Sequence, residues 1–124
     1  EDGRLITAPT KGSPEAVIQT VLAASVNENA EMGWDTLLSV LHSGNKGARA
    51  LKDWKSMKYP ASRRKVGLFL EDPRRLHFRV MRTETPNPET IRLFVRNAKS
   101  LPTPCELRRD PEAGDAWRVW VCSL

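Results

Sequence analysis

The sequence is poor in the side chains that most often carry acid–base and metal chemistry: its 124 residues include two histidines, two cysteines and one tyrosine. The histidines and cysteines form no close ligand pair, so we expect no zinc site. Phosphate-binding glycine loops, nucleophile elbows and HExxH motifs are also missing, which leaves acyl and phosphoryl transfer without support. The sequence therefore predicts neither a metal nor a cofactor.

Long hydrophobic runs are missing as well. No apolar stretch approaches the ~20 residues needed to cross a bilayer, so we expect no membrane span. Hydrophobic residues make up 40% of the chain and charged residues 28%, a balance typical of folded proteins. The 20 Lys and Arg against 15 Asp and Glu favour anionic partners only mildly, and nucleic acid is not expected as a partner.

The first residues show no periodicity. Residues 1–12 mix charge, threonine, proline and glycine, and we interpret them as a leader or linker before a single domain over residues 13–124. The sequence begins with Glu1 rather than Met, which favours a processed or trimmed chain and leaves a removed signal peptide open. Together with a disulfide, this would favour an exported or periplasmic bacterial protein.

The next part of the chain has helical periodicity. Ser13, Pro14 and Glu15 are typical of a helix start, with an N-cap, a proline in the first turn and an acid near the positive dipole end. Apolar spacings of three and four predict a helix over residues 13–26, a second one entered near Asn29 with its apolar stripe over 32–41, and a shorter one after Gly47. We expect the last helix to break at Tyr59-Pro60, because a residue before proline avoids the helical conformation.

Beyond residue 60 the apolar period changes from 3.6 to 2, which is typical of strands with one buried face. The alternation predicts strands over residues 66–70, 76–81 and 91–96, a fourth that starts near Thr103, and a last one over 117–123. Helices come before strands without βαβ alternation. The expected fold class is therefore α+β, with N-terminal helices packed on a curved antiparallel β-sheet.

The two cysteines fall in the last predicted hairpin. In one register of that hairpin Cys105 lies opposite Cys122, as a cross-strand disulfide requires. In the other register Leu107 pairs with Val119, and Cys105 then faces Val121. The two registers differ by one residue, so a disulfide and two half-buried thiols stay open as alternatives.

A few short motifs resemble those of one superfamily. They are Ser13-Pro14-Glu15-Ala16-Val17, Pro102-Thr103-Pro104 with Leu107, and Trp117-Arg118-Val119 followed by Ser123-Leu124. Over residues 13–124 the chain is similar to bacterial members of the nuclear transport factor 2-like superfamily. The resemblance implies a cone-like, cystatin-like roll with a pocket between sheet and helices, and often a homodimer through the sheet. It implies no single function, because enzymes and non-enzymes share such folds.

The sharpest functional feature is one face of the predicted sheet, where arginines mix with aromatic side chains. Its members are Arg79, Arg92, Phe94, Arg96, Arg108, Arg118 and Trp120. The mixture is typical of protein interfaces and would also suit a small anionic ligand. The alternative is a solvated face on which arginine stems cover the rings. The basic clusters Arg63-Arg64-Lys65 and Arg74-Arg75 are interpreted as edge protection at strand entrances.

Few residues could act as a general base in a pocket; the weak candidates are Asp35, Asp53, His77 and Glu106. We therefore predict a non-catalytic domain that binds a small ligand or another protein, with a small isomerase or cyclase as the alternative. The enzyme would need a deep apolar pocket that holds such a base. An interior filled by Trp34, Trp54 and Phe78 would favour the binding domain.

Overall fold

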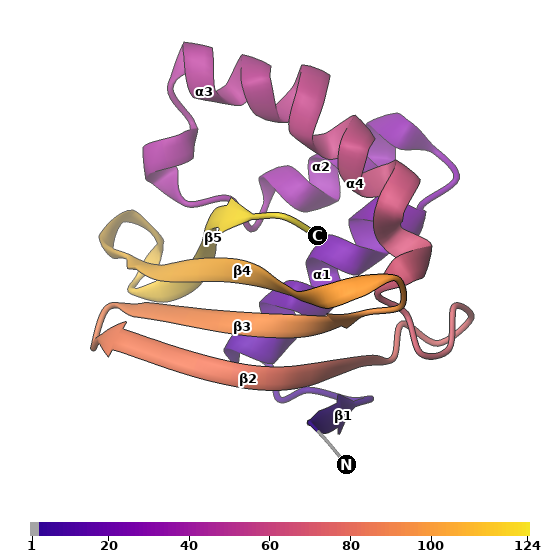
Figure 1. Ribbon diagram of the computed structural model, residues 1–124. Helices are drawn as coiled ribbons and strands as arrows, with labels where there is room; N and C mark the ends of the chain where they lie inside the picture. The colour runs from indigo at the N-terminus through magenta and orange to yellow at the C-terminus, as the bar shows by residue number, and fades with distance from the viewer. Residues whose placement is uncertain (1–2) are drawn as a thin grey trace.

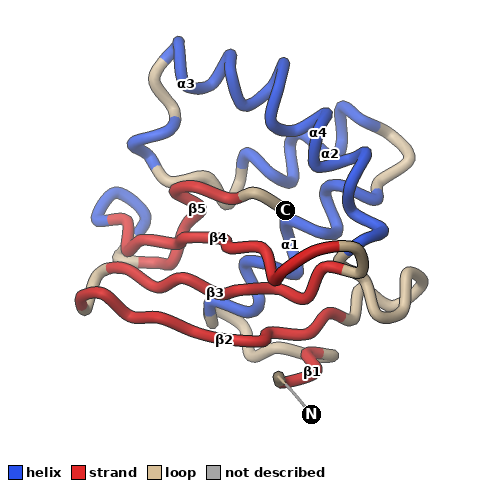
Figure 2. The backbone as a smooth tube through the Cα atoms, in the orientation of Figure 1, coloured by secondary structure: helices blue, strands red, loops and turns tan. Residues whose placement is uncertain are grey.

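The computed structural model describes residues 3–124 and has two layers, an antiparallel sheet and a set of helices against one of its faces (Figure 1). The five strands follow one another in chain order across the sheet, as the tube in Figure 2 also shows. Their bounds are β1 Arg4–Ile6, β2 Phe78–Asn87, β3 Thr90–Asn97, β4 Ser100–Asp110 and β5 Ala116–Cys122. The predicted α+β class with an antiparallel sheet is confirmed.

Part of the segment interpreted as a leader belongs to this sheet. β1 pairs antiparallel with the start of β2, with Ile6 opposite Phe78, and the Ile6 side chain is buried. β1 therefore covers the first residues of β2 at the sheet edge. Residues 1 and 2 of the predicted leader lie outside the described residues.

The first two helices begin at capping residues. α1 (Pro14–Val26) starts after Ser13, whose hydroxyl accepts a backbone N–H in the first turn. α2 (Ala30–Leu38) starts after Asn29, which caps it in the same way. α2 ends sooner than predicted because the chain at Leu41 forms a parallel bridge with β5 instead.

The third helix is longer than predicted. It consists of α3 (Ala48–Asp53), a π-helical turn (Trp54–Lys58) and α4 (Tyr59–Lys65), which run on without interruption. The break expected at Tyr59-Pro60 is therefore wrong. Tyr59 N–H donates to the carbonyl of Trp54, five residues back, and Pro60 enters the first turn of α4. Proline has no N–H and cannot donate the hydrogen bond of a regular α-helix. The wider π turn does not require that bond at this position, so the proline is tolerated.

The strand predicted over residues 66–70 is also wrong. The segment continues the third helix as a short 3-10 turn, Val66–Leu68. Phe69 is buried there, whereas Val66, Leu68 and Leu70 are half-buried. Val66 and Phe69 are three residues apart, as on one side of a helix. An alternating run of only five residues is too short to distinguish a strand period of 2 from a helical period of 3.6.

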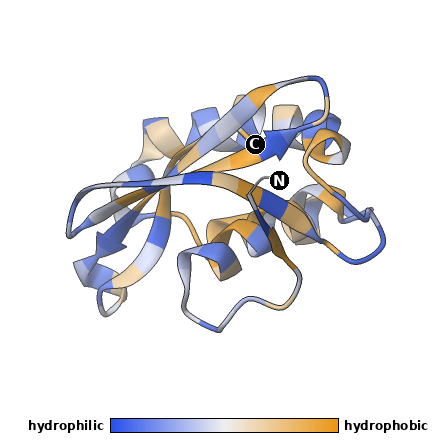
Figure 3. Cartoon of the chain, turned by 60° about the horizontal axis from the view of Figure 1, so that its bottom comes forward, coloured by the Kyte–Doolittle hydropathy of each residue, from blue (hydrophilic) through white to orange (hydrophobic). Residues whose placement is uncertain are grey.

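The core lies between the sheet and the helices. Hydrophobic and hydrophilic residues alternate along the strands, which Figure 3 shows by colour, and the hydrophobic ones face the helices. Both layers supply the large, fully buried side chains, among them Ile18, Leu22, Leu37, Trp54, Phe69, Phe78, Leu93 and Leu107. Removal of this apolar surface from water is the main driving force for the fold.

Both registers considered for the last hairpin occur in it. Leu107 pairs with Val119 near the turn, and Cys105 pairs with Cys122 further along. Cys105 and Cys122 are joined by a disulfide. The structure therefore selects the disulfide over two free thiols.

A β-bulge reconciles the two registers. Between the pairs Glu106–Val121 and Leu107–Val119, one step along β4 corresponds to two steps along β5, so Trp120 is the inserted residue. A strict alternation would place Val119 and Val121 on the same face. Val119 is instead fully buried and Val121 is 51% exposed, because the bulge turns the strand between them.

The loop after α2 docks on this hairpin through Asp110. Its carboxylate, 2% exposed, accepts hydrogen bonds from the N–H and the hydroxyl of Ser43, both at 2.8 Å, and from Glu112 N–H at 3.0 Å. Burial raises the pKa of Asp110, but these hydrogen bonds outweigh it and hold the pKa below its ordinary value. The ionised carboxylate therefore fastens the loop to the sheet.

We expect Asp110→Asn to lower the free energy of unfolding by about 2 kcal/mol at pH 7, because an amide nitrogen cannot accept from Ser43. The folded pKa of Asp110 is lowered, so its contribution is present above the unfolded pKa of about 3.9 and is lost as the pH falls below it. Urea titrations of both proteins at pH 7 and pH 3 measure this. A difference in stability that is as large at pH 3 as at pH 7 would contradict the assignment.

Candidate functional site

Most residues of the predicted arginine face lie on the side of the sheet opposite the buried core. On β3, Arg92, Phe94 and Arg96 alternate with the buried Leu93 and Val95. Arg79 of β2 and Arg108 of β4 extend this surface to the neighbouring strands, and Arg118 and Trp120 come from β5. The structure thus brings most of the side chains that were predicted to bind together on one outer face, whereas Arg118 lines a hollow beside Ala16 and Val17 of α1.

Acidic side chains neutralise the centre of this face. Glu106 lies 2.8 Å from both Arg92 and Arg108, and Glu84 lies 3.3 Å from both Arg92 and Arg82. Burial raises the pKa of Glu106, but the hydrogen bonds from the two arginines outweigh it and lower the pKa below its usual value. Three arginines and two glutamates therefore form one chain of ion pairs, which reduces the attraction for an external anion.

A further glutamate pairs with two other arginines of this face. Glu71 lies 2.9 Å from Arg96 and 3.6 Å from Arg79. Arg118 donates to the backbone carbonyl of Trp117 at 3.0 Å. Most of the arginines predicted to bind a ligand are therefore already engaged within the chain.

The aromatic rings of the face are also covered from within. The guanidinium of Arg82 lies 3.9 Å from the centre of the Phe94 ring, and that of Arg108 lies 4.3 Å from Trp120. Trp120 further packs edge-on against His42, with ring centres 5.2 Å apart. An added Cβ at Gly44 would lie 2.5 Å from the Trp120 ring. This arrangement supports the alternative in which arginines cover the aromatic surface.

The four candidate bases lie on different elements. Asp35 and Asp53 are exposed on α2 and α3, His77 is half-buried just before β2, and Glu106 belongs to the ion pairs of the outer face. A carboxylate with a lowered pKa, as in Glu106, is a weak general base. No observed contact joins these four residues into a site.

Three large aromatic side chains are buried in the interior of the fold. Trp34, Trp54 and Phe78 are 6%, 2% and 0% exposed. These are the residues whose burial was predicted to favour a binding domain over an enzyme.

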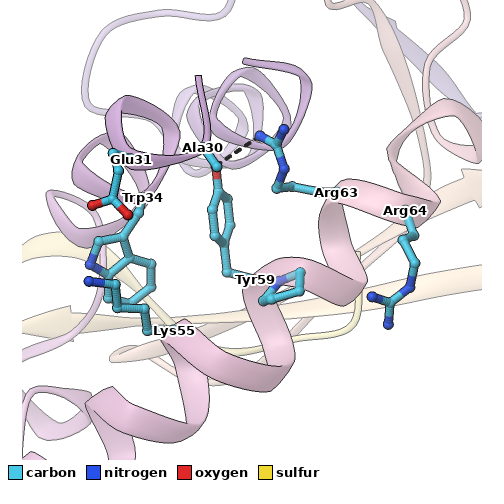
Figure 4. A pocket seen from close by; sticks show the side chains of 8 residues that line it. Ala30, Glu31, Trp34, Lys55, Tyr59, Arg63 and Arg64 are labelled. Carbon is cyan, nitrogen blue, oxygen red and sulfur yellow. Dashed lines mark hydrogen bonds between the residues drawn. The ribbon is translucent and has the colours of Figure 1, made fainter. Parts of the chain in front are cut away.

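A pocket does occur on the helical layer, between α2 and the third helix. Its volume is about 420 Å³, and its lining is formed by Ala30, Glu31, Trp34, Lys55, Tyr59, Pro60, Arg63 and Arg64. The rings of Trp34 and Tyr59 lie 5.8 Å apart and tilted by 51°. Figure 4 shows them between the two helices, with the cationic side chains around them. The volume falls in the range of small-molecule sites, roughly 300–1,000 Å³.

The end of α1 positions two of these side chains. Tyr59 hydroxyl donates to the carbonyl of Ala24 at 2.8 Å, and Arg63 donates to the carbonyl of Asn27 at 2.5 Å. Arg63 also reaches the Tyr59 oxygen at 3.3 Å, which is the dashed contact in Figure 4. The last carbonyls of a helix have no hydrogen-bond donor within the helix. Tyr59 and Arg63 supply such donors at the end of α1, and these hydrogen bonds fix the positions of both side chains. Gly33 of α2 gives the Tyr59 hydroxyl the space it needs.

Sequence reasoning missed this pocket because it misplaced Arg63 and Arg64. They were assigned to a strand entrance, and the helix was expected to stop at Pro60. The signal was present, since Lys55, Tyr59 and Arg63 follow one another at spacings of four, as on one side of a helix. The expected break at the proline concealed it.

Comparisons with models of protein families, with curated proteins and with solved structures find no match to this chain. Within residues 3–124, no cluster of three His, Cys, Asp or Glu side chains is arranged to hold a metal ion. Nor does any helix in this part of the chain combine the length and apolar character of a membrane span. The case for a function therefore rests on the pocket and on the surface charges.

Proposed function

We propose that this domain is a non-catalytic binding module and that its ligand is a small organic anion with an aromatic body, held in the pocket between α2 and α4. The observation that supports this is the combination of two aromatic walls, Trp34 and Tyr59, with three cations, Lys55, Arg63 and Arg64. Apolar walls with a few polar groups are typical of small-molecule sites. Guanidinium and ammonium groups select carboxylates and phosphates.

The pocket suits an anion better than the sheet face does. Glu31 also lines the pocket, but among the described residues no carboxylate oxygen lies within 4 Å of the charged nitrogens of Lys55 or Arg64. The arginines at the centre of the sheet face already share Glu84 and Glu106. A free cation gains a partner when an anion binds, whereas a paired one must give up a partner, so the ligand should prefer the pocket.

The superfamily resemblance and the homodimer are also proposals. The order of helices and antiparallel strands is compatible with a roll of the nuclear transport factor 2-like kind. A homodimer through the outer sheet face is favoured by the exposed Val121 at the edge of that face, although the internal ion pairs weaken the case. The isomerase or cyclase alternative gains no support, because none of the four candidate bases lines the α2–α4 pocket.

Thermal unfolding with pairs of matched small molecules tests the binding module. We expect benzoate and phenyl phosphate to raise the Tm, and benzamide and benzyl alcohol to leave it nearly unchanged. A ligand at one hundred times its Kd adds about 2.7 kcal/mol to the free energy of unfolding. Equal shifts with charged and neutral compounds, or none at all, would rule out an aromatic anion.

Two arginine variants locate the site. Arg64→Gln removes a cation that lines the pocket, whereas Arg74→Gln makes the same change at an exposed position in the loop before β2. The ligand-induced shift should fall in the first variant and persist in the second. A shift that persists in both would place the ligand elsewhere.

A further inference from the structure

The positive charge of this protein is concentrated in one segment. Residues 46–65 hold eight of the 20 Lys and Arg and one of the 15 Asp and Glu. The segment therefore carries a net charge of +7, whereas the rest of the chain, with twelve cations against fourteen acids, carries −2. The modest overall charge conceals this difference.

The cations of the segment are accessible. Six of them are exposed, namely Lys46, Arg49, Lys52, Lys55, Lys58 and Arg64. No ion pair to any of these six is found among residues 3–124. The contrast with the outer sheet face is clear, because each cluster of arginines there encloses a glutamate. The third helix therefore presents uncompensated positive charge.

The segment is also extended and carries an apolar contact point. α3, the π turn and α4 together make a continuous helix of 18 residues, Ala48–Lys65, which is roughly 27 Å long at 1.5 Å per residue. It lies at the outside of the helical layer, away from the sheet (Figure 1). Met57, between Lys55 and Lys58, is 67% exposed. A large apolar side chain among cations is typical of helices that lie on a membrane surface.

We infer that the segment Lys46–Lys65 docks on an anionic lipid bilayer, with its cations against the headgroups and Met57 inserted between them. Charge complementarity supplies the main attraction, because each Lys or Arg near such a surface contributes about fivefold to the partition coefficient. The exposed Met57 adds an apolar contribution to the free energy of binding at a lipid surface. The phosphates of a nucleic acid would offer this side chain no apolar partner. The segment's one aromatic residue that does not line the α2–α4 pocket, Trp54, is 2% exposed, so the segment offers no ring outside that pocket for base stacking.

This docking is separate from the proposed ligand site, although the two are neighbours. Lys46 and Lys52 do not line the α2–α4 pocket. Lys11 and Lys99 are exposed outside the segment, one before α1 and the other at the turn between β3 and β4. The four lysines allow two double variants with the same change of net charge, Lys46→Glu with Lys52→Glu and Lys11→Glu with Lys99→Glu.

Co-sedimentation with vesicles tests the inference. The whole chain should bind vesicles of 70% phosphatidylcholine and 30% phosphatidylglycerol at 50 mM salt and should be released at 500 mM, because salt screens the attraction. It should not bind pure phosphatidylcholine. The Lys46→Glu/Lys52→Glu variant should partition at least about 25-fold more weakly, from two losses of fivefold each. The Lys11→Glu/Lys99→Glu variant should bind nearly as the wild type does.

Three results would overturn the inference. Equal binding to neutral and anionic vesicles would show that charge does not drive docking. Equal loss in both double variants would show that net charge matters and the segment does not. Binding to a 20-base-pair DNA duplex without binding to anionic vesicles would assign the surface to nucleic acid. Circular dichroism confirms that each variant is folded. Met57→Ser leaves the net charge unchanged, and it should weaken binding to anionic vesicles while the protein stays folded.

Discussion

Gly33→Ala will lower the free energy of unfolding by about 3 kcal/mol, although the same change usually stabilises a helix by about 1 kcal/mol. A Cβ at Gly33 would overlap both the Tyr59 hydroxyl and the carbonyl oxygen of Ala24. These two atoms share a buried hydrogen bond of 2.8 Å. Overpacking costs about 1–3 kcal/mol, and a buried carbonyl that loses its donor costs about 1–3 kcal/mol more. The sum exceeds the gain in helix propensity.

Urea unfolding of three variants checks this explanation. Gly67→Ala is the matched control, because a Cβ there meets no atom within 4 Å, and its stability should change by less than about 0.5 kcal/mol. In Tyr59→Phe the hydroxyl is absent, so adding Gly33→Ala should cost less than it does in the wild type. If the two changes were simply additive, the contact between α2 and Tyr59 would not be the cause.

Loss of the disulfide will have an effect of similar size. The bond between Cys105 and Cys122 closes a loop with a sequence separation of 17, for which restriction of the unfolded chain predicts about 3 kcal/mol. Cys105 is fully buried, so the double variant Cys105→Ala/Cys122→Ala is preferable to serine, which would bury a hydroxyl. We expect that variant to unfold with a free energy lower by about 3 kcal/mol.

Reduction of the wild type should have the same effect as the double variant, and reductant should leave the double variant unchanged. Mass spectrometry after alkylation, with and without reductant, reports the state of both thiols directly. Two alkylated cysteines in the untreated protein would contradict the disulfide. Equal stability of oxidised and reduced protein would contradict its role in holding the hairpin.

The parts of the fold that were predicted correctly depend on long or chemically explicit patterns. The capping residue Ser13 and the apolar stripe after it identify α1 over its full length, and the alternation around Leu93 identifies β3. The fold class follows from the order of such elements, without knowledge of any side-chain contact. Local patterns of this kind survive because tertiary packing reinforces them.

Two of the errors occurred where the backbone departs from regular geometry. A π turn before Pro60 lets a proline continue a helix that it should end, and a bulge at Trp120 changes the facing of β5. A single inserted residue causes each of them, and the apolar period does not show where such a residue is inserted. The pocket was missed for the same reason, since its lysine and arginines lie on both sides of Pro60.

The uneven distribution of charge gives this protein a permanent electric dipole. Residues 46–65 carry +7, residues 66–124 carry +2 and residues 1–45 carry −4, so the positive potential outside the molecule is strongest along the third helix. A molecule of this kind rotates in the field of a negatively charged body before it touches it. At low ionic strength, where the Debye length reaches about 30 Å, it would approach with its third helix in front. The rate of encounter, and not only the affinity, should therefore depend on salt.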